Sequence, residues 1–318
     1  MDILVKGDKL RKYFQVGPKR LLHAVDDVDV EIPRGTTLGV VGESGCGKST
    51  LARVVLGLIP KTGGKLYFDG RDLDTLTKKE KAEYRRQMQI IFQDPYSSLD
   101  PRMSVYESIA EPLDMNHVFS KKAEKLDYIM ELMERVGLAA RFINAYPHEM
   151  DGGRRQRVCI ARALALNPQF IVCDEPVSAL DVSIQAQILN LLMDMQDSTG
   201  LTYMFITHDM SVVKHISNEI MVMYLGQCVE RAPSKELFEN PLHPYTQALL
   251  SAVPKPVINR MSNTEILRGE VSNPINPPVG CRFAPRCKFC TEACTQKNFE
   301  LADQGNRHSV ACRLFDQA

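Results

Sequence analysis

The residues best suited to chemistry form a glycine-rich run, Gly42-Glu43-Ser44-Gly45-Cys46-Gly47-Lys48-Ser49. A glycine, four residues, a second glycine, a lysine and a hydroxyl in this order are typical of a phosphate-binding loop. The glycines allow backbone N–H groups to curl around phosphate oxygens, and a helix that follows directs its positive end at the same anion. We therefore expect Lys48 to contact the β- and γ-phosphates of a nucleotide and the Ser49 hydroxyl to bind Mg²⁺.

Two adjacent carboxylates and a histidine follow apolar runs farther along the chain. Asp174 and Glu175 close the run 170–173, where a carboxylate at the end of a strand can reach the Mg²⁺ of a phosphate loop. Successive side chains of a strand point to opposite faces, so Asp174 suits the metal and Glu175 suits the attacking water. His208 follows the apolar run 203–206, which makes it a candidate contact for the γ-phosphate.

The elements that must position these side chains are those of an α/β protein. The pattern predicts short strands over the first 60 residues, a strand over 37–41 and a helix from Ser49 onward. Residues 72–165 have a helical pattern, with an amphipathic segment over 123–136. The runs 170–173 and 203–206 are nearly all apolar, which indicates strands of a parallel sheet covered on both faces.

Composition excludes several classes of protein. The chain has 318 residues, of which 44% are hydrophobic and 25% charged, as in globular proteins. Lys plus Arg and Asp plus Glu both number 39, so the basic surplus of a nucleic-acid-binding protein is missing. No apolar run approaches the roughly 20 residues that span a bilayer, and the first residues lack the order of a signal peptide. We expect a cytoplasmic protein.

The nine cysteines divide into two groups. Four stand singly among apolar neighbours, whereas the last 38 residues contain Cys281, Cys287, Cys290, Cys294 and Cys312. In a reducing compartment such a cluster suggests metal before disulfides, and the spacing alone suits either tetrahedral zinc or an iron–sulfur cluster. Prolines also become frequent after about residue 235, where we place a domain boundary.

Taken together, these residues resemble the nucleotide-binding subunit of an ATP-binding-cassette (ABC) transporter, from about residue 5 to the C-terminus. Besides the loop and Asp174-Glu175, the family's glutamine loop matches Gln93 in Ile91-Phe92-Gln93-Asp94-Pro95. Its D-loop matches Ser178-Ala179-Leu180-Asp181, and its switch histidine matches His208. The aromatic residue that stacks on adenine matches Phe14, beside Tyr13.

The resemblance implies a fold, a domain order and a set of functional residues. The fold is a P-loop NTPase core with a parallel sheet over 1–235, an inserted helical subdomain at about 95–160 and a Cys/Pro-rich region over 236–318. The implied catalytic residues are Glu175, His208 and Gln93, and the Mg²⁺ ligands are Ser49, Gln93 and Asp174. The implied nucleotide-binding residues are Phe14, Gly42, Ser44, Gly45, Cys46, Gly47, Lys48, Ser49, Thr50, Gln93 and Asp174, together with Asp151, Gly152 and Gly153 of the signature sequence.

Three segments resemble the oligopeptide/dipeptide importer branch, which also includes nickel importers: residues 94–102, residues 241–246 and the closing cysteines. In this branch Cys281, Cys287, Cys294 and Cys312 match the ligands of a four-iron four-sulfur cluster, with zinc or no metal as alternatives and Cys290 left without a role. The implied function is ATP hydrolysis that energises the import of peptides, or of nickel or another small solute.

The resemblance also implies partners. The chain would dimerise head to tail with a second ATPase subunit at the cytoplasmic face of the membrane, as a peripheral protein. Two membrane permease subunits would dock on the segment from Gln93 to Arg102, and an extracellular or periplasmic binding protein would deliver the cargo. Two other functions compete with this one. A soluble ABC ATPase of translation or DNA repair is disfavoured by the single phosphate loop and the zero net charge. A small-molecule kinase is disfavoured by the Gln93, Asp181 and His208 motifs, which it would not need.

The signature sequence departs from the family. Where the family usually has Leu-Ser-Gly-Gly-Gln, this chain has Met150-Asp151-Gly152-Gly153-Arg154. An ionised Asp151 would bring a negative charge toward the partner's nucleotide, which at about 4 Å and an effective dielectric of 20 costs roughly 4 kcal/mol. The sequence therefore predicts one competent and one slow ATP site, unless Asp151 caps its helix and leaves both sites working.

Overall fold

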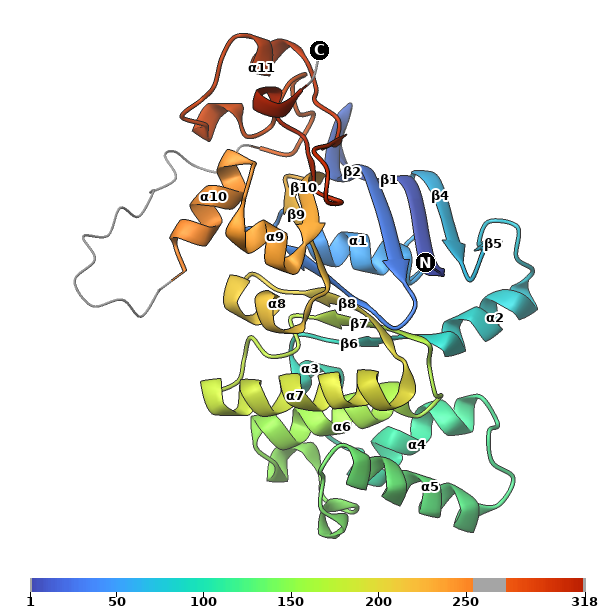
Figure 1. Ribbon diagram of the computed structural model, residues 1–318. Helices are drawn as coiled ribbons and strands as arrows, with labels where there is room; N and C mark the ends of the chain where they lie inside the picture. Colours follow the sequence, from blue (N-terminus) through green and yellow to red (C-terminus); the bar gives the residue numbers. More distant parts are fainter. Residues whose placement is uncertain (1, 254–272, 317–318) are drawn as a thin grey trace, which may run out of the picture. The chain divides into compact units, whose positions relative to one another are not determined.

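The computed structural model describes residues 2–253 and 273–316, which form two compact units (Figure 1). The first unit contains the chain up to Thr75 and the chain from Phe205 onward, and the second contains 76–204. The chain passes between them within strand β8 (Thr202–Ile206).

An antiparallel sheet begins the first unit, in the strand order β2-β1-β4-β5. Its strands are β1 (Ile3–Gly17), β2 (Arg20–Pro33), β4 (Gly63–Phe68) and β5 (Arg71–Asp72). The expected short strands are wrong here, because β1 and β2 form one long hairpin of 15 and 14 residues. Lys9 and Asp27 have positive φ values, and register shifts interrupt the pairing between Gly7 and Lys12. Bulges of this kind interrupt the alternation of apolar and polar residues, so the sequence pattern does not reveal one long strand.

A second set of strands in the first unit carries the phosphate loop. Strand β3 (Thr37–Val41) pairs in parallel with β9 (Glu219–Tyr224), and β10 (Gln227–Pro233) pairs antiparallel with β9. The short strands β12 (Ser309–Val310) and β11 (Ala302–Asp303) continue from β10. Residues near the C-terminus therefore extend the same sheet, because β12 pairs with Glu230 and Arg231 of β10.

The helices of the first unit are short. They are α1 (Lys48–Val55), α8 (Met210–Ile216), α9 (Ser234–Glu239), α10 (Pro244–Ser251) and α11 (Ala293–Gln296), with 3₁₀ turns η3 (Ala284–Arg286) and η4 (Arg313–Phe315). A buried cluster joins Val222 and Tyr224 of β9 to Tyr245 of α10 and to Phe283 of the cysteine-rich region. This apolar cluster packs the C-terminal region against the strand that neighbours β3.

The second unit is mainly helical, as expected for a helical insertion. Strands β6 (Met88–Ile91) and β7 (Phe170–Asp174) pair in parallel. The helices are α2 (Lys78–Gln87), α3 (Pro95–Ser98), α4 (Val105–Met115), α5 (Lys122–Arg135), α6 (Gly152–Leu164) and α7 (Val182–Thr199), with 3₁₀ turns η1 (Ala140–Phe142) and η2 (Pro147–Glu149). Helix α5 confirms the amphipathic segment and buries Ile129, Leu132 and Met133.

Across 2–253 and 273–316, no helix has both the length and the apolar character needed to cross a membrane. The sequence-based boundary near residue 235 stays a prediction.

Candidate nucleotide site

The glycine-rich run connects β3 to α1, as predicted. Every residue of β3 is buried, and α1 begins at Lys48 directly after the loop. Gly47 caps the helix with φ +106°, and a Cβ atom there would lie 2.0 Å from the carbonyl oxygen of Ala24. A Cβ on Gly42 would lie 2.2 Å from the carbonyl oxygen of Met223. Side chains are therefore excluded at both positions, and the loop keeps the bare backbone that a phosphate cradle requires.

The Lys48 side chain is hydrogen-bonded to the backbone of its own loop. Its side chain is 5% exposed, and its ammonium group donates to the carbonyl oxygens of Gly42 at 2.8 Å and Glu43 at 3.0 Å. Ser49 and Thr50 follow in the first turn of α1, while Ser44 and Gly45 lie exposed at the tip of the loop. The donor set, a buried ammonium group with backbone amides at a helix N-terminus, fits a polyphosphate.

Phe14 and Tyr13 lie on β1 of the same unit and have different surroundings. Tyr13 stacks on His23 with ring centroids 4.0 Å apart, and its hydroxyl donates to Asp26. Phe14 is exposed, with the Lys12 ammonium group 4.7 Å from its ring centroid. Phe14 is therefore the ring with a face open for stacking.

His208 lies at the end of β8, in the first unit. It is exposed and directly precedes Asp209, which caps α8 by accepting a hydrogen bond from the backbone N–H of Ser211 at 2.7 Å. The preceding residue, Thr207, donates its N–H to the carbonyl oxygen of Val40 in β3 at 3.2 Å. This bond places the start of the histidine turn beside the strand that leads into the phosphate loop.

The second unit brings Gln93 and Glu175 together. Ile91 at the end of β6 is paired in register with Cys173 of β7, so the residues that follow the two strands emerge at one edge. There the Gln93 amide Nε2 donates to a carboxylate oxygen of Glu175 at 3.0 Å. Glu175 has a φ of +49°, a left-handed conformation that is uncommon for non-glycine residues. Asp174, one residue earlier, is buried at the end of β7.

The signature sequence and the D-loop are neighbours in the second unit. Asp151 caps α6, and Gly152 and Gly153 form its first turn. A Cβ on Gly152 would lie 3.2 Å from the Leu180 side chain, and one on Gly153 would lie 2.8 Å from Ile184. The two glycines therefore allow α6 to approach the D-loop and the start of α7 closely.

The expectation of an iron–sulfur cluster on Cys281, Cys287, Cys294 and Cys312 is wrong. These cysteines and Cys290 all lie within the described residues, where no three His, Cys, Asp or Glu side chains are arranged to hold a metal ion. The same finding gives no support to the zinc alternative. Burial raises the pKa of the Cys281 thiol to about 11 and also raises that of Cys287 and Cys312.

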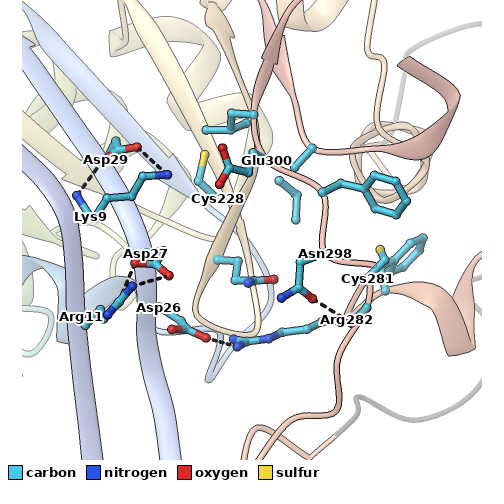
Figure 2. A pocket seen from close by; sticks show the side chains of 17 residues that line it. Lys9, Arg11, Asp26, Asp27, Asp29, Cys228, Cys281, Arg282, Asn298 and Glu300 are labelled. Carbon is cyan, nitrogen blue, oxygen red and sulfur yellow. Dashed lines mark hydrogen bonds and ion pairs between the residues drawn. The ribbon is translucent and has the colours of Figure 1, made fainter. Parts of the chain in front are cut away.

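A cavity of about 340 Å³ lies between the β1–β2 hairpin and the cysteine-rich region (Figure 2). Its three aspartates have partners: Asp26 pairs with Arg282, Asp27 with Arg11 at 2.6 Å, and Asp29 with Lys9 at 3.7 Å. The cavity contains none of the predicted nucleotide-binding residues.

Sequence reasoning missed two residues that contact the phosphate loop. The Tyr245 hydroxyl accepts a hydrogen bond from the backbone N–H of Glu43 at 2.8 Å, and Arg286 forms an ion pair with the Glu43 carboxylate at 2.7 Å. The sequence offered one indication, Glu43 itself, because a carboxylate in an anion-binding loop repels the anion unless a nearby cation neutralises it. The sequence could not identify an arginine 243 positions away as that cation.

Family models match two parts of the chain. Residues 25–178 match the ABC transporter family, and residues 229–294 match the oligopeptide/dipeptide transporter C-terminal region.

Curated relatives and solved structures agree with these matches. The chain is 48% identical to the putative oligopeptide transport ATP-binding protein YkfD of Bacillus subtilis, over 99% of this chain and 96% of YkfD. It is 50% identical to the oligopeptide transport ATP-binding protein OppF of Salmonella typhimurium, over 94% and 90% of the two chains. The structure of cbiO1 from Clostridium perfringens, part of the ABC transporter complex cbiONQ, superposes with a TM-score of 0.67 and 27% identity, covering 76% of this chain and 92% of cbiO1. With the phosphate loop of the first unit and the signature helix of the second, these likenesses establish that the chain belongs to the ABC transporter family, among the ATP-binding proteins of oligopeptide and dipeptide transport.

Proposed function

We propose that this ABC ATPase subunit hydrolyses ATP to energise the import of oligopeptides or dipeptides. The observation that carries the proposal is full-length similarity, since the relatives named for oligopeptide transport match both the ATPase region and the C-terminal region. A P-loop protein outside transport would have no reason to share the C-terminal region.

The residues of the first unit bind the nucleotide in this proposal. Phe14 stacks on adenine, Lys48 and the loop amides neutralise the phosphates, and His208 contacts the γ-phosphate. A bound Mg²⁺ ion would neutralise the negative charge that develops on the phosphates during transfer. Ser49 would be one of its ligands, and a half-buried hydroxyl in the first turn of α1 fits that chemistry.

The residues of the second unit supply the metal's other ligands and the base. Asp174 and Gln93 would ligate Mg²⁺, and Glu175 would polarise the attacking water. The hydrogen bond from Gln93 to Glu175 supports this division, because it brings the two side chains together and orients the carboxylate. Asp151, Gly152 and Gly153 would face the nucleotide held by a second ATPase subunit.

The proposed assembly contains that second ATPase, two permease subunits and a substrate-binding protein, with this chain peripheral on the cytoplasmic side. The segment from Gln93 to Arg102 is the proposed permease contact. Tyr96 in this segment is 64% exposed, which supports a surface made for a partner.

Two substitutions in the assembled transporter test the proposal. Glu175→Gln should bind ATP like the wild type and hydrolyse it at less than about a tenth of the wild-type rate, because the amide retains size and loses the base. Lys48→Ala should instead weaken ATP binding. Peptide uptake should stop in both. Hydrolysis above a tenth of the wild-type rate by Glu175→Gln would reject Glu175 as the base, and unchanged peptide uptake in both variants would reject the function.

A further inference from the structure

Glu43 places an acid in the middle of a loop that would bind a polyphosphate. Two hydrogen bonds neutralise it: Arg286 Nη1 lies 2.7 Å from one carboxylate oxygen and Nη2 lies 3.0 Å from the other. The Arg286 side chain is only 6% exposed, and Glu43 raises the pKa of Arg286 further, so the guanidinium is always charged. A fork of this kind fixes both the charge and the orientation of the carboxylate.

The backbone of Glu43 is held from the same region. Its N–H donates to the Tyr245 hydroxyl at 2.8 Å, and Tyr245 lies fully buried in α10 against Tyr224 and Phe283. Its carbonyl oxygen accepts from Lys48 at 3.0 Å. A continuous chain of polar contacts therefore runs from Arg286 through Glu43 to Lys48.

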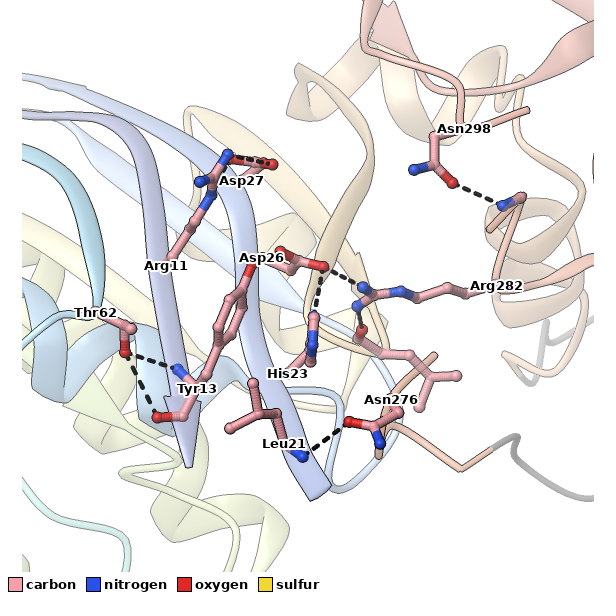
Figure 3. A network of polar contacts seen from close by, with 12 residues as sticks. Arg11, Tyr13, Leu21, His23, Asp26, Asp27, Thr62, Asn276, Arg282 and Asn298 are labelled. Carbon is pink, nitrogen blue, oxygen red and sulfur yellow. Dashed lines mark hydrogen bonds and ion pairs between the residues drawn. The ribbon is translucent and has the colours of Figure 1, made fainter. Parts of the chain in front are cut away.

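The turn that carries Arg286 also reaches the strand of the candidate adenine-stacking residue. Arg282 contacts Asp26 and the carbonyl oxygen of Leu225, and Asp26 in turn accepts hydrogen bonds from Tyr13 and His23 (Figure 3). Tyr13 precedes Phe14 on β1. One short segment of the C-terminal region thus contacts the loop of Lys48 directly and is linked to the strand of Phe14 through Asp26 of β2.

We infer that Arg286 is a positioning residue for the nucleotide, acting through Glu43. Arg286 neutralises the acid of the loop and Tyr245 holds the loop backbone, so the C-terminal region sets the affinity for ATP. The inference rests on the proposed function, because it takes the loop to bind ATP. It assigns to the C-terminal region a part in nucleotide binding.

Removing the charge of Arg286 and removing that of Glu43 should have opposite effects on ATP binding. Arg286→Gln leaves an unpaired carboxylate beside the phosphates, and we expect about tenfold weaker ATP binding, the effect of one like-charge contact in a partly screened site. Glu43→Gln leaves an unpaired guanidinium there, and we expect binding about threefold tighter, with a steeper dependence on salt. The double variant should bind ATP within about threefold of the wild type. A residue needed only for folding would weaken binding in all three.

The experiment titrates a fluorescent ATP analogue with Mg²⁺ into the full-length chain, and measures KM and kcat for ATP in the assembled transporter. For Arg286→Gln, KM should rise with kcat within about twofold of the wild type, because Glu175 and Gln93 are untouched. The matched control is Arg231→Gln, which removes an arginine paired with Glu219 at 2.6 Å in the same unit. This control should leave ATP affinity unchanged.

Weaker binding by Glu43→Gln, or equal losses in Arg286→Gln and Arg231→Gln, would overturn the inference. If Arg286→Gln does not fold, Glu43→Gln alone tests the inference. This variant keeps Arg286 in place, and the inference requires it to bind ATP more tightly than the wild type. The proposed function fails separately: Lys48→Ala binding the analogue as well as the wild type would show that the loop is not the ATP site.

Discussion

Asp151 accepts a hydrogen bond from the backbone N–H of Arg154 at 2.8 Å, and its second carboxylate oxygen lies 3.1 Å from the Arg154 guanidinium. The carboxylate therefore caps α6 and is paired within its own helix. This geometry matches the alternative in which both ATP sites work, because the charge expected to repel a phosphate has a cation beside it. The asymmetry of the two sites stays a prediction.

Removal of the compensating cation should expose the charge of Asp151. We expect Arg154→Gln to lower the ATPase rate of the assembled transporter severalfold, up to about tenfold, because both side chains are exposed and solvent screens the pair. Adding Asp151→Ser to Arg154→Gln should restore the rate, since serine also caps a helix and carries no charge. Steady-state ATP hydrolysis measures both effects.

The control for this series is Arg141→Gln. Arg141 and Arg154 both lie over the ring of Phe142, with guanidinium carbons 5.1 Å and 4.7 Å from its centroid. Only Arg154 pairs with Asp151. Equal rates in Arg141→Gln and Arg154→Gln would mean that charge compensation at Asp151 does not matter for hydrolysis.

The hydrogen bond from Gln93 to Glu175 predicts a change in the pH dependence of hydrolysis. Gln93→Glu places two carboxylates about 3 Å apart, and two such groups cannot both ionise at their ordinary pKa values. The acid limb of the ATPase rate should then move to higher pH by about one unit or more. Gln93→Ala should lower the rate and leave that limb in place. A profile of Gln93→Glu that overlays the profile of Gln93→Ala would show that the two side chains do not interact during turnover.

Local patterns predicted the elements around the site well. Residues 37–41 and 170–173 are buried apolar runs between turn residues, and they form β3 and all but the last residue of β7. The helix after the loop begins one residue earlier than expected, at Lys48. These features depend on neighbouring residues alone, so the sequence contains them directly.

Features that depend on distant residues could not be predicted. The bulged hairpin of β1 and β2 lacks clean alternation, and the partners of Glu43 come from α10 and η3, more than 200 residues away. The iron–sulfur cluster predicted from the cysteine spacing is wrong because spacing does not specify side-chain positions, and the described cysteines are not arranged as a metal site. For Glu43 and for the cysteines, the missing information was the packing of the C-terminal region.

Glu230 is fully buried and should be important for the stability of that region. Its carboxylate accepts from the backbone N–H groups of Leu242 at 2.7 Å and His243 at 3.0 Å, and His308 Nε2 lies 2.7 Å from it. Glu230→Ala leaves these buried groups without partners, which costs about 3 kcal/mol or more. We expect the apparent Tm to fall by roughly 6–10 °C, measured by thermal denaturation.

The control is Glu219→Ala, which removes a carboxylate from the neighbouring strand β9. Glu219 is 21% exposed and pairs with Arg231, so its loss leaves groups that water can reach. Its effect on the Tm should be less than half that of Glu230→Ala. Similar losses in both variants would contradict a special role for the buried carboxylate.

His243 should make the stability of the protein depend on pH. Burial lowers the pKa of this histidine to about 4, and its Nδ1 accepts a hydrogen bond from the backbone N–H of Tyr245 at 3.0 Å. The unfolded chain takes up a proton near pH 6.5, so between about pH 6.5 and 4 the unfolded state binds more protons than the folded state. The stability is highest above this range and falls as the pH decreases, and the loss amounts to about 2–3 kcal/mol at pH 4.

His243→Asn tests this prediction, because asparagine also caps a helix and does not titrate. Chemical denaturation at pH 7 and at pH 4.5 should show a smaller loss of unfolding free energy in His243→Asn than in the wild type. His215→Asn, at an exposed position of α8, is the control and should follow the wild-type curve. Parallel pH curves for the wild type and His243→Asn would show that His243 does not cause the acid sensitivity. Since α10 also carries Tyr245, which holds the backbone of Glu43, protonation of His243 should weaken ATP binding below pH 5 in the wild type more than in His243→Asn.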